Sequence, residues 1–287
     1  MLKTAVLTLL ALQTCLDRRG FSSNILDGQD GPRTQAALVA YCASRGLPPP
    51  AENASAGDLL RRLFPDEGEI FSEYVITTNE LKALVRIPST PAGKAALSHM
   101  GYESAVELLA ERAHTSPKIV ALLNPDLDLA QLKPGTAVML PDVSPAADNR
   151  KAALVRVSLS AFTVSAVDAA GKLLAVFPCS IARDKAKLPP PGIIRITSCI
   201  ENPNYTYTPE RQTRKRRMSR QIFPAGPNNP VGTIWLGLSL PGYGIHGTPS
   251  PRTIGCAESH GCFRLANWNA EKLYRLVRPG TRVLIEK

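Results

Sequence analysis

The sequence predicts an α+β protein of several domains: a small helical N-terminal unit, a middle segment and a mostly β domain with a mixed sheet. At 287 residues the chain exceeds a typical single domain. Helical hydrophobic spacing prevails early in the chain, whereas alternating patterns prevail after the polar linker at 144–151 (SPAADNRK). We therefore expect units at residues 1–65, 66–143 and 150–287.

The composition is that of a folded protein with a basic surface. Hydrophobic residues make up 44% of the chain, enough for packed cores. Aromatic residues make up only 6%, which argues against a stacking surface for single-stranded nucleic acid. The formal net charge of +10 fits either an ordinary soluble surface or attraction to a polyanion such as nucleic acid or an anionic cell wall.

The first 65 residues are expected to form short helices. The apolar run from Thr4 to Leu12 is short and lacks a clear cleavage site, so we expect an amphipathic helix there rather than an export signal. No run approaches the ~20 apolar residues that a membrane span needs. Pro32 suits the first turn of a second helix, and Ser55, with Asp58 three residues later, suits the cap of a third.

The middle segment has weaker patterns. Residues 71–76 are expected to form a strand and residues 104–113 a helix. His99 and His114 lie here without partner motifs, so we expect them at the surface or half-buried rather than acting as ligands.

Alternation predicts strands over 153–168 and 172–182, with a turn at Gly171, and a further strand after the turn at 191–192. Asn269 is expected to cap a helix over 270–277, and residues 281–286 to form the last strand. The basic run 211–220 (RQTRKRRMSR) could be a solvated loop, a nucleic-acid contact or a segment that steers carboxylate-rich polymers.

A stretch near the C-terminus combines a base, a nucleophile and several glycines. His246 can serve as a base near neutral pH, and Cys262 can serve as a nucleophile once deprotonated. The backbone amides of Gly261 and Cys262 are candidate donors to an oxyanion. His260 is the alternative base.

The imidazole of His246 needs a partner that fixes its tautomer. A carbonyl near Gly247 and the hydroxyl of Ser259 are the two candidates. We expect the backbone, because no aspartate lies between Gly242 and Arg264 and the single carboxylate there is Glu258.

Six cysteines leave several pairings open. Cys262 must carry a thiol if it is a nucleophile. Cys15 with Cys42 could join two helices, and Cys179 with Cys199 could join two strands. Cys256 could be a small buried residue or could form a reversible disulfide that masks Cys262.

The motifs IHGT (245–248), PRTIG (251–255) and SHGCFRL (259–265) resemble the signature of the L,D-transpeptidase catalytic domain of bacterial cell-wall enzymes. The resemblance covers roughly the last 135 residues. It implies that Cys262 attacks a peptide carbonyl, that His246 is the base, and that further positions belong to the site. These are Ser259, His260 and Gly261 in catalysis, and Tyr243, Gly247, Thr248 and Arg264 in substrate binding.

The resemblance also implies the reaction. Cys262 would form an acyl-enzyme with a tetrapeptide stem, release D-Ala and pass the acyl group to an amine. A second stem would give a 3–3 cross-link, water would give L,D-carboxypeptidase activity, and an exported protein's lysine would give protein anchoring. Neither a cofactor, a metal nor a nucleic acid is implied, and the expected location is the periplasm or cell envelope.

Two further resemblances lie upstream. The string LQTCLDRRGFSSNILDGQDGPRTQAAL (12–38) resembles a peptidoglycan-binding helical module, with a generic helical domain as the alternative. The motifs LNP (123–125), LKPGT (132–136) and LP (140–141) resemble part of a LysM module, with a spacer as the alternative. Because the first module begins so near Met1, we expect the given sequence to lack its export signal or to start late.

Two rival interpretations remain. A papain-like endopeptidase would place its cysteine before its histidine, whereas here His246 precedes Cys262. A cell-wall-binding protein with an inactive catalytic domain would not need His246, Gly261, Cys262 and Arg264 together.

Overall fold

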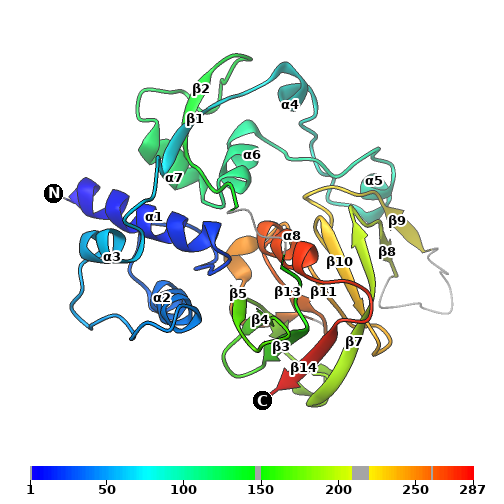
Figure 1. The fold of residues 1–287 in the computed structure, drawn as a ribbon. Coiled ribbons are helices and arrows are strands. Elements are labelled where there is room, and N and C mark those ends of the chain that lie inside the picture. Colours follow the sequence, from blue (N-terminus) through cyan, green and yellow to red (C-terminus); the bar gives the residue numbers. More distant parts are fainter. Residues whose placement is uncertain (1, 146–149, 209–219, 260) are drawn as a thin grey trace.

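The computed structural model describes residues 2–145, 150–208, 220–259 and 261–287. Three parts are visible in Figure 1: blue N-terminal helices, a cyan and green middle segment, and a sheet domain that runs from green to red. Among the described residues, no helix is both long and apolar enough to cross a membrane. The predicted fold class, helices at the N-terminus followed by a mixed-sheet domain, is confirmed.

The N-terminal unit consists of α1 (Leu2–Arg18), α2 (Pro32–Ser44) and α3 (Ala56–Leu63). Pro32 lies in the first turn of α2, where its missing N–H removes no helical bond. Ser55 accepts a hydrogen bond from the amide of Asp58 and caps α3, as predicted. The helices enclose an apolar core that includes Leu16, Leu38, Tyr41 and Phe64.

The middle segment is built on a two-stranded antiparallel sheet. Strand β1 (Phe71–Val75) pairs with β2 (Ala137–Pro141), so the two ends of the middle segment meet. Four helices lie between them in the chain: α4 (Thr78–Lys82), α5 (Pro91–Ala95), α6 (Ala105–Arg112) and α7 (Pro117–Leu123). The predicted strand and the predicted helix, which Ser104 caps, are both present.

The main sheet of the sheet domain contains eight strands in the order β13-β11-β10-β7-β14-β3-β4-β5. The bounds are β3 Leu154–Ser158, β4 Thr163–Val167, β5 Leu173–Pro178, β7 Gly192–Glu201, β10 Ile234–Leu238, β11 Gly244–His246, β13 Phe263–Arg264 and β14 Arg282–Glu286. The β14–β3 and β11–β13 pairs are parallel and the others are antiparallel, so the sheet is mixed.

Two short strand pairs and three helical segments complete this domain. Strand β6 (Ile181–Ala182) pairs with β12 (Ala257–Ser259), and β8 (Tyr205–Tyr207) pairs with β9 (Gln221–Phe223). The 3-10 turns are η1 (Lys185–Lys187) and η2 (Pro251–Thr253). Helix α8 (Asn267–Leu276) packs on β10 and β11.

The sheet curls until its two edges meet. Ser180, just after β5, exchanges two backbone hydrogen bonds of 2.9 Å with Arg264 of β13. This bridge joins the first strand of the order to the last, so the strand that carries Arg264 is held from both sides. The interior is filled by apolar side chains, among them Val155, Phe177, Ile245 and Phe263.

The predicted cap of the last helix and the two suggested disulfides are wrong. The last helix begins at Asn267 rather than after an Asn269 cap, because Ala266 takes the N-cap position and Asn269 lies in the first turn, fully buried. The thiols of Cys15, Cys42, Cys179 and Cys199 form no disulfide; the first three are buried in apolar cores, where each acts as a small hydrophobic residue.

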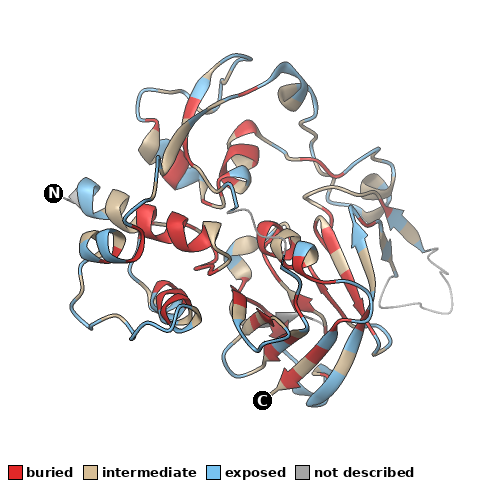
Figure 2. Cartoon of the chain, in the orientation of Figure 1, coloured by how far each residue is buried: buried red, intermediate tan, exposed pale blue. Residues whose placement is uncertain are grey.

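Both upstream parts pack against the sheet domain. Figure 2 shows a continuous buried stretch along the second half of α1, which points toward that domain. Asp17, at the end of α1, is fully buried and binds Lys272 of α8 (Oδ2–Nζ 2.5 Å) and His114 (Oδ2–Nδ1 2.6 Å). All three parts of the chain therefore meet at one carboxylate.

Candidate active site

The register of two neighbouring strands sets the segment that carries Cys262 beside the strand that carries His246. Strands β11 and β13 run parallel, with Ile245 opposite Phe263 and His246 opposite Arg264. Ile245 and Phe263 are fully buried in the core. Because side chains alternate along a strand, His246 and Arg264 belong to the opposite face, and Cys262 directly precedes β13.

His246 is held by its own backbone neighbour and by an aromatic ring. Its Nδ1 lies 2.7 Å from the carbonyl oxygen of Gly247. A carbonyl can only accept, so Nδ1 carries the proton and Nε2 is left with a lone pair. The indole of Trp235, directly opposite in β10, stacks on the imidazole with centroids 5.6 Å apart.

Burial lowers the pKa of His246 to about 4, and the positive charge of Arg264 also lowers it. The hydrogen bond to Gly247 raises this pKa and opposes both effects. The ring is therefore neutral over the physiological pH range. A neutral imidazole with a lone pair at Nε2 is the form that can remove a proton.

Cys262 directly precedes β13 and is partly exposed. Its Sγ donates to the carbonyl oxygen of Gly242 at 3.5 Å. Burial raises the pKa of the Cys262 thiol, and a hydrogen bond from the backbone of Gly244 opposes this. Thiol and imidazole are thus both neutral at rest, so proton transfer must accompany nucleophilic attack.

Gly261 has a backbone conformation that favours glycine. Its φ is +155°, a region that L side chains rarely adopt, although an added Cβ would meet only Tyr243 (3.6 Å) and Lys187 (3.8 Å). Glycine is therefore favoured at position 261 by its backbone conformation rather than by a lack of space for a side chain. Ser259 ends β12, and His260 lies outside the described residues.

The predicted substrate-binding residues have different surroundings. Tyr243 packs over Gly261 and donates its hydroxyl to the carbonyl of Lys187 at 2.9 Å. Thr248 is buried, and its hydroxyl accepts from the amide of Ser250. Arg264 follows Cys262 by two residues and lies opposite His246 in the parallel pair of strands.

Sequence analysis missed Trp235 as a neighbour of His246. The signal was present, because the turn between β10 and β11 fixes the antiparallel register and sets Trp235 across from His246. The same register explains Gly244, where an added Cβ would lie 2.6 Å from the Trp235 ring.

The structure also describes Cys256 and one residue of the basic run 211–220. Cys256 carries a thiol that donates to the carbonyl oxygen of Thr253 at 3.0 Å. The basic run lies outside the described residues except for Arg220, which is exposed. No group of three His, Cys, Asp or Glu side chains with metal-binding geometry occurs among the residues that the structure describes.

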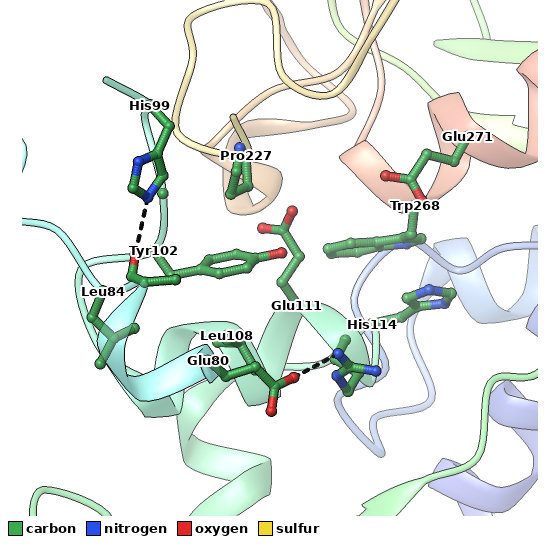
Figure 3. A pocket seen from close by; sticks show the side chains of 13 residues that line it. Glu80, Leu84, His99, Tyr102, Leu108, Glu111, His114, Pro227, Trp268 and Glu271 are labelled. Carbon is green, nitrogen blue, oxygen red and sulfur yellow. Dashed lines mark hydrogen bonds and ion pairs between the residues drawn. The ribbon is translucent and has the colours of Figure 1, made fainter. Parts of the chain in front are cut away.

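A cavity of about 480 Å³ lies between the middle segment and the sheet domain, and its lining includes neither His246 nor Cys262. Figure 3 shows Glu111 at its centre, between the ring of Tyr102 and Trp268, with Glu271 and His114 beyond. His114, expected at the surface or half-buried, stacks on Trp268 with centroids 5.1 Å apart.

The curled mixed sheet has His246 at the end of β11 and Cys262 directly before the adjacent strand β13. This arrangement defines a class of domain with a candidate site for cysteine-dependent acyl transfer. Residues 152–285 match the YkuD family, described as the L,D-transpeptidase catalytic domain. The family match and the curated relatives thus both relate this part of the chain to L,D-transpeptidase catalytic domains.

Curated relatives agree with this assignment. The putative L,D-transpeptidase YkuD of Bacillus subtilis is 48% identical over 70 residues, which cover 24% of this chain and 41% of that protein. A putative L,D-transpeptidase of Fuscovulum blasticum, encoded in the ATP synthase subunits region, is 39% identical over 112 residues, 38% of this chain and 57% of that protein. The chain thus spans about half the length of these relatives.

Solved structures described as L,D-transpeptidases match part of the chain at low identity. L,D-transpeptidase 3 from Mycobacterium tuberculosis is 16% identical, with a TM-score of 0.38, over 55% of this chain and 77% of that one.

Proposed function

We propose that this chain is a peptidoglycan L,D-transpeptidase that acts through an acyl-enzyme on Cys262. The observation that supports the proposal is the parallel pairing of β11, which ends at His246, with β13, which Cys262 directly precedes. The family of residues 152–285 supplies the reaction class.

The first half-reaction begins from a neutral pair. Nε2 of His246 takes the proton of Sγ while the sulfur attacks the carbonyl carbon between the third and fourth residues of a tetrapeptide stem. The oxyanion accepts hydrogen bonds from the amides of Gly261 and Cys262, and one such donor is worth about 3 kcal/mol in the transition state. The imidazolium then protonates the leaving nitrogen, the C–N bond breaks, D-Ala departs and a thioester remains.

The second half-reaction reverses the roles. The amine of an acceptor stem attacks the thioester carbon and gives a proton to His246. The C–S bond breaks, the thiol is restored by that proton, and a new peptide bond links the two stems. Water in place of the amine gives L,D-carboxypeptidase activity, and a lysine of an exported protein gives a protein-anchoring reaction.

The upstream units are proposed to bring the catalytic domain to its polymer. We assign residues 1–65 to peptidoglycan binding and residues 66–143 to a LysM-like or spacer role, next to a catalytic domain at 150–287. Their close packing on the sheet domain supports a role in placing the active site relative to the wall. The corresponding location is the periplasm or cell envelope.

Incubation with a disaccharide-tetrapeptide, followed by mass analysis of the products, tests this function. A cross-linked dimer supports the transpeptidase, and a tripeptide supports the carboxypeptidase. Unchanged substrate, together with no adduct from a carbapenem, would favour a wall-binding protein with an inactive site. Cys256→Ala is the matched control for Cys262→Ala, because the Cys256 thiol only donates to Thr253.

A further inference from the structure

The middle segment reaches the catalytic histidine through two side chains. Glu111, in the last turn of α6, accepts a hydrogen bond from Nδ2 of Asn267 at 2.7 Å. Asn267 is the first residue of α8 and is buried, with 1% of its surface exposed. Its other end lies against Gly247, whose carbonyl holds Nδ1 of His246.

The contact between Asn267 and Gly247 is close. A Cβ added at Gly247 would lie 2.2 Å from Oδ1 of Asn267, so only glycine leaves room for that oxygen. The amide of Gly247 is held as well, because it donates to the carbonyl of Ile234 at 3.1 Å. Gly247 is therefore held at its N–H by β10 and at its Cα by Asn267, next to the carbonyl that binds His246.

The surroundings of Asn267 decide which way its amide points. Glu111 and the carbonyl of Pro227, at 3.1 Å, are both acceptors and need the NH₂ group. The amide of Thr233 is a donor, 3.3 Å from Oδ1. A flipped amide would set its NH₂ against the Thr233 N–H and its oxygen against two acceptors, so only one orientation satisfies all partners.

Glu111 costs stability where it lies. Burial raises its pKa to about 7, and the charges of Glu271 and Glu107 add to this effect, whereas the hydrogen bond from Asn267 opposes it. An apolar side chain would fill the same space without burying a carboxyl group. The contact that Glu111 makes with Asn267 gives this position a role that packing alone does not explain.

We propose that Asn267 is a positioning residue for His246, and that Glu111 of the middle segment holds Asn267 in its working orientation. The inference rests on the proposed role of His246 as the base. In this arrangement the middle segment does more than bring the enzyme to the wall: it fixes the imidazole tautomer that leaves Nε2 able to accept a proton.

The test compares Glu111→Leu, Glu111→Gln and Asn267→Ala with Glu107→Gln. Glutamine keeps an acceptor oxygen for Asn267, whereas leucine does not. Glu107 is the matched control, since it accepts a hydrogen bond from Asn228, the residue after Pro227, at 2.8 Å. Thermal unfolding identifies any variant that does not fold.

The first readout is the 15N chemical shifts of the imidazole in protein labelled at histidine, with the His246 signal assigned through His246→Gln. Wild type, Glu111→Gln and Glu107→Gln should show a single Nδ1-protonated tautomer at pH 6. Glu111→Leu and Asn267→Ala should show a mixture of tautomers. This readout needs no turnover, so it is independent of the proposed function.

The second readout is the rate of Cys262 acylation by a carbapenem. Glu111→Leu and Asn267→Ala should be about 10- to 100-fold slower, because small displacements of a catalytic group are costly. Glu111→Gln and Glu107→Gln should match wild type. Folded Glu111→Leu and Asn267→Ala proteins with a single Nδ1-protonated tautomer and wild-type rates would overturn the inference. If the carbapenem never acylates wild type, but Glu111→Leu and Asn267→Ala still show a mixture of tautomers, the proposed function is wrong and the positioning role stands.

Discussion

Nδ1 of His246 and the carbonyl oxygen of Gly247 lie 2.7 Å apart, and this hydrogen bond determines which imidazole nitrogen can act as the base. The ring belongs to β11, and the sulfur it would serve lies between β12 and β13, directly before β13. The parallel pairing of β11 with β13, rather than proximity in sequence, sets these two segments side by side.

The acid limb of the pH–rate profile should lie near pH 4. His246 is neutral above its lowered pKa of about 4, so acylation should persist through pH 5 and fall only as the ring is protonated below that. The measurement is the rate of carbapenem acylation from pH 3.5 to 8. His99→Gln, at an exposed histidine, should leave the profile unchanged. An acid limb near the ordinary value of 6.5 would contradict the buried neutral ring.

Replacement of His246 by glutamine should slow acylation by about 10²- to 10⁴-fold, the usual contribution of a general base. The burial of His246 should also make the free energy of unfolding depend on pH. Because the folded state binds fewer protons than the unfolded state between pH 4 and 6.5, this group's stabilising contribution should be lost as pH falls through that window. Urea unfolding of wild type and His246→Gln at pH 5 and 7 measures the difference, which should be larger at pH 7.

Glu111 should have the opposite pH dependence. Its pKa is raised from 4.5 to about 7, so the folded state holds the proton more tightly and its contribution to stability is lost as pH rises through that range. The groups around it are Glu107 on its own helix, Glu271 on α8, and Glu80, Tyr102, Arg112 and His114 in the cavity lining. The penalty for burying the charged carboxylate therefore grows with pH, and Glu111→Gln should lose less stability than wild type between pH 5 and 8. Parallel curves for the two proteins would show that this carboxyl group does not titrate in the window.

Asp17 should anchor the N-terminal helices to the sheet domain. Burial alone would raise its pKa, but Lys272 and His114 lower it well below the ordinary value, so it is charged. Asp17→Ala leaves Lys272 buried without its carboxylate, and such a loss costs about 3–5 kcal/mol. Asp58→Ala, at an exposed pair with Arg61 that water and salt screen, should cost much less. Equal unfolding free energies for the two variants would contradict the assignment of Asp17 as an anchor.

Gly232→Ala should damage the site more than a glycine change elsewhere. Its φ is +64°, and an added Cβ would lie 1.9 Å from Oδ1 of Asn267 and 2.6 Å from the Gly247 carbonyl carbon. Gly171 has a similar φ of +80° but open space around it. Gly171→Ala should therefore cost only the backbone strain, about 1 kcal/mol, and keep full acylation. Gly232→Ala with wild-type stability and rate would show that this three-way contact is not tight.

The sequence predicted those features that depend on local patterns. Ser55 caps a helix as expected, the helix predicted over 104–113 is present, and the alternating stretches form strands of the sheet, because caps and periodicity depend on residues a few positions apart. Asn269 was misplaced because asparagine suits a cap, while the helix here begins earlier, at a buried Asn267 with long-range partners.

Long-range polar contacts were not predictable in this way. Asp17 lies 97 positions from His114 and 255 from Lys272, and Glu111 lies 156 from Asn267. Nothing in hydrophobic periodicity pairs such residues, since a buried carboxylate looks like a surface one until its partners are known. The contacts between the upstream units and the catalytic domain therefore emerge only in the folded chain.

Trapping the covalent intermediate tests the central claim most directly. Wild-type protein mixed with disaccharide-tetrapeptide, quenched in acid and digested, should yield a Cys262 peptide that carries the substrate minus D-Ala. The adduct should persist in Cys256→Ala and be absent from Cys262→Ala. Release of D-Ala by Cys262→Ala at the wild-type rate, or an adduct on a different residue, would contradict the account.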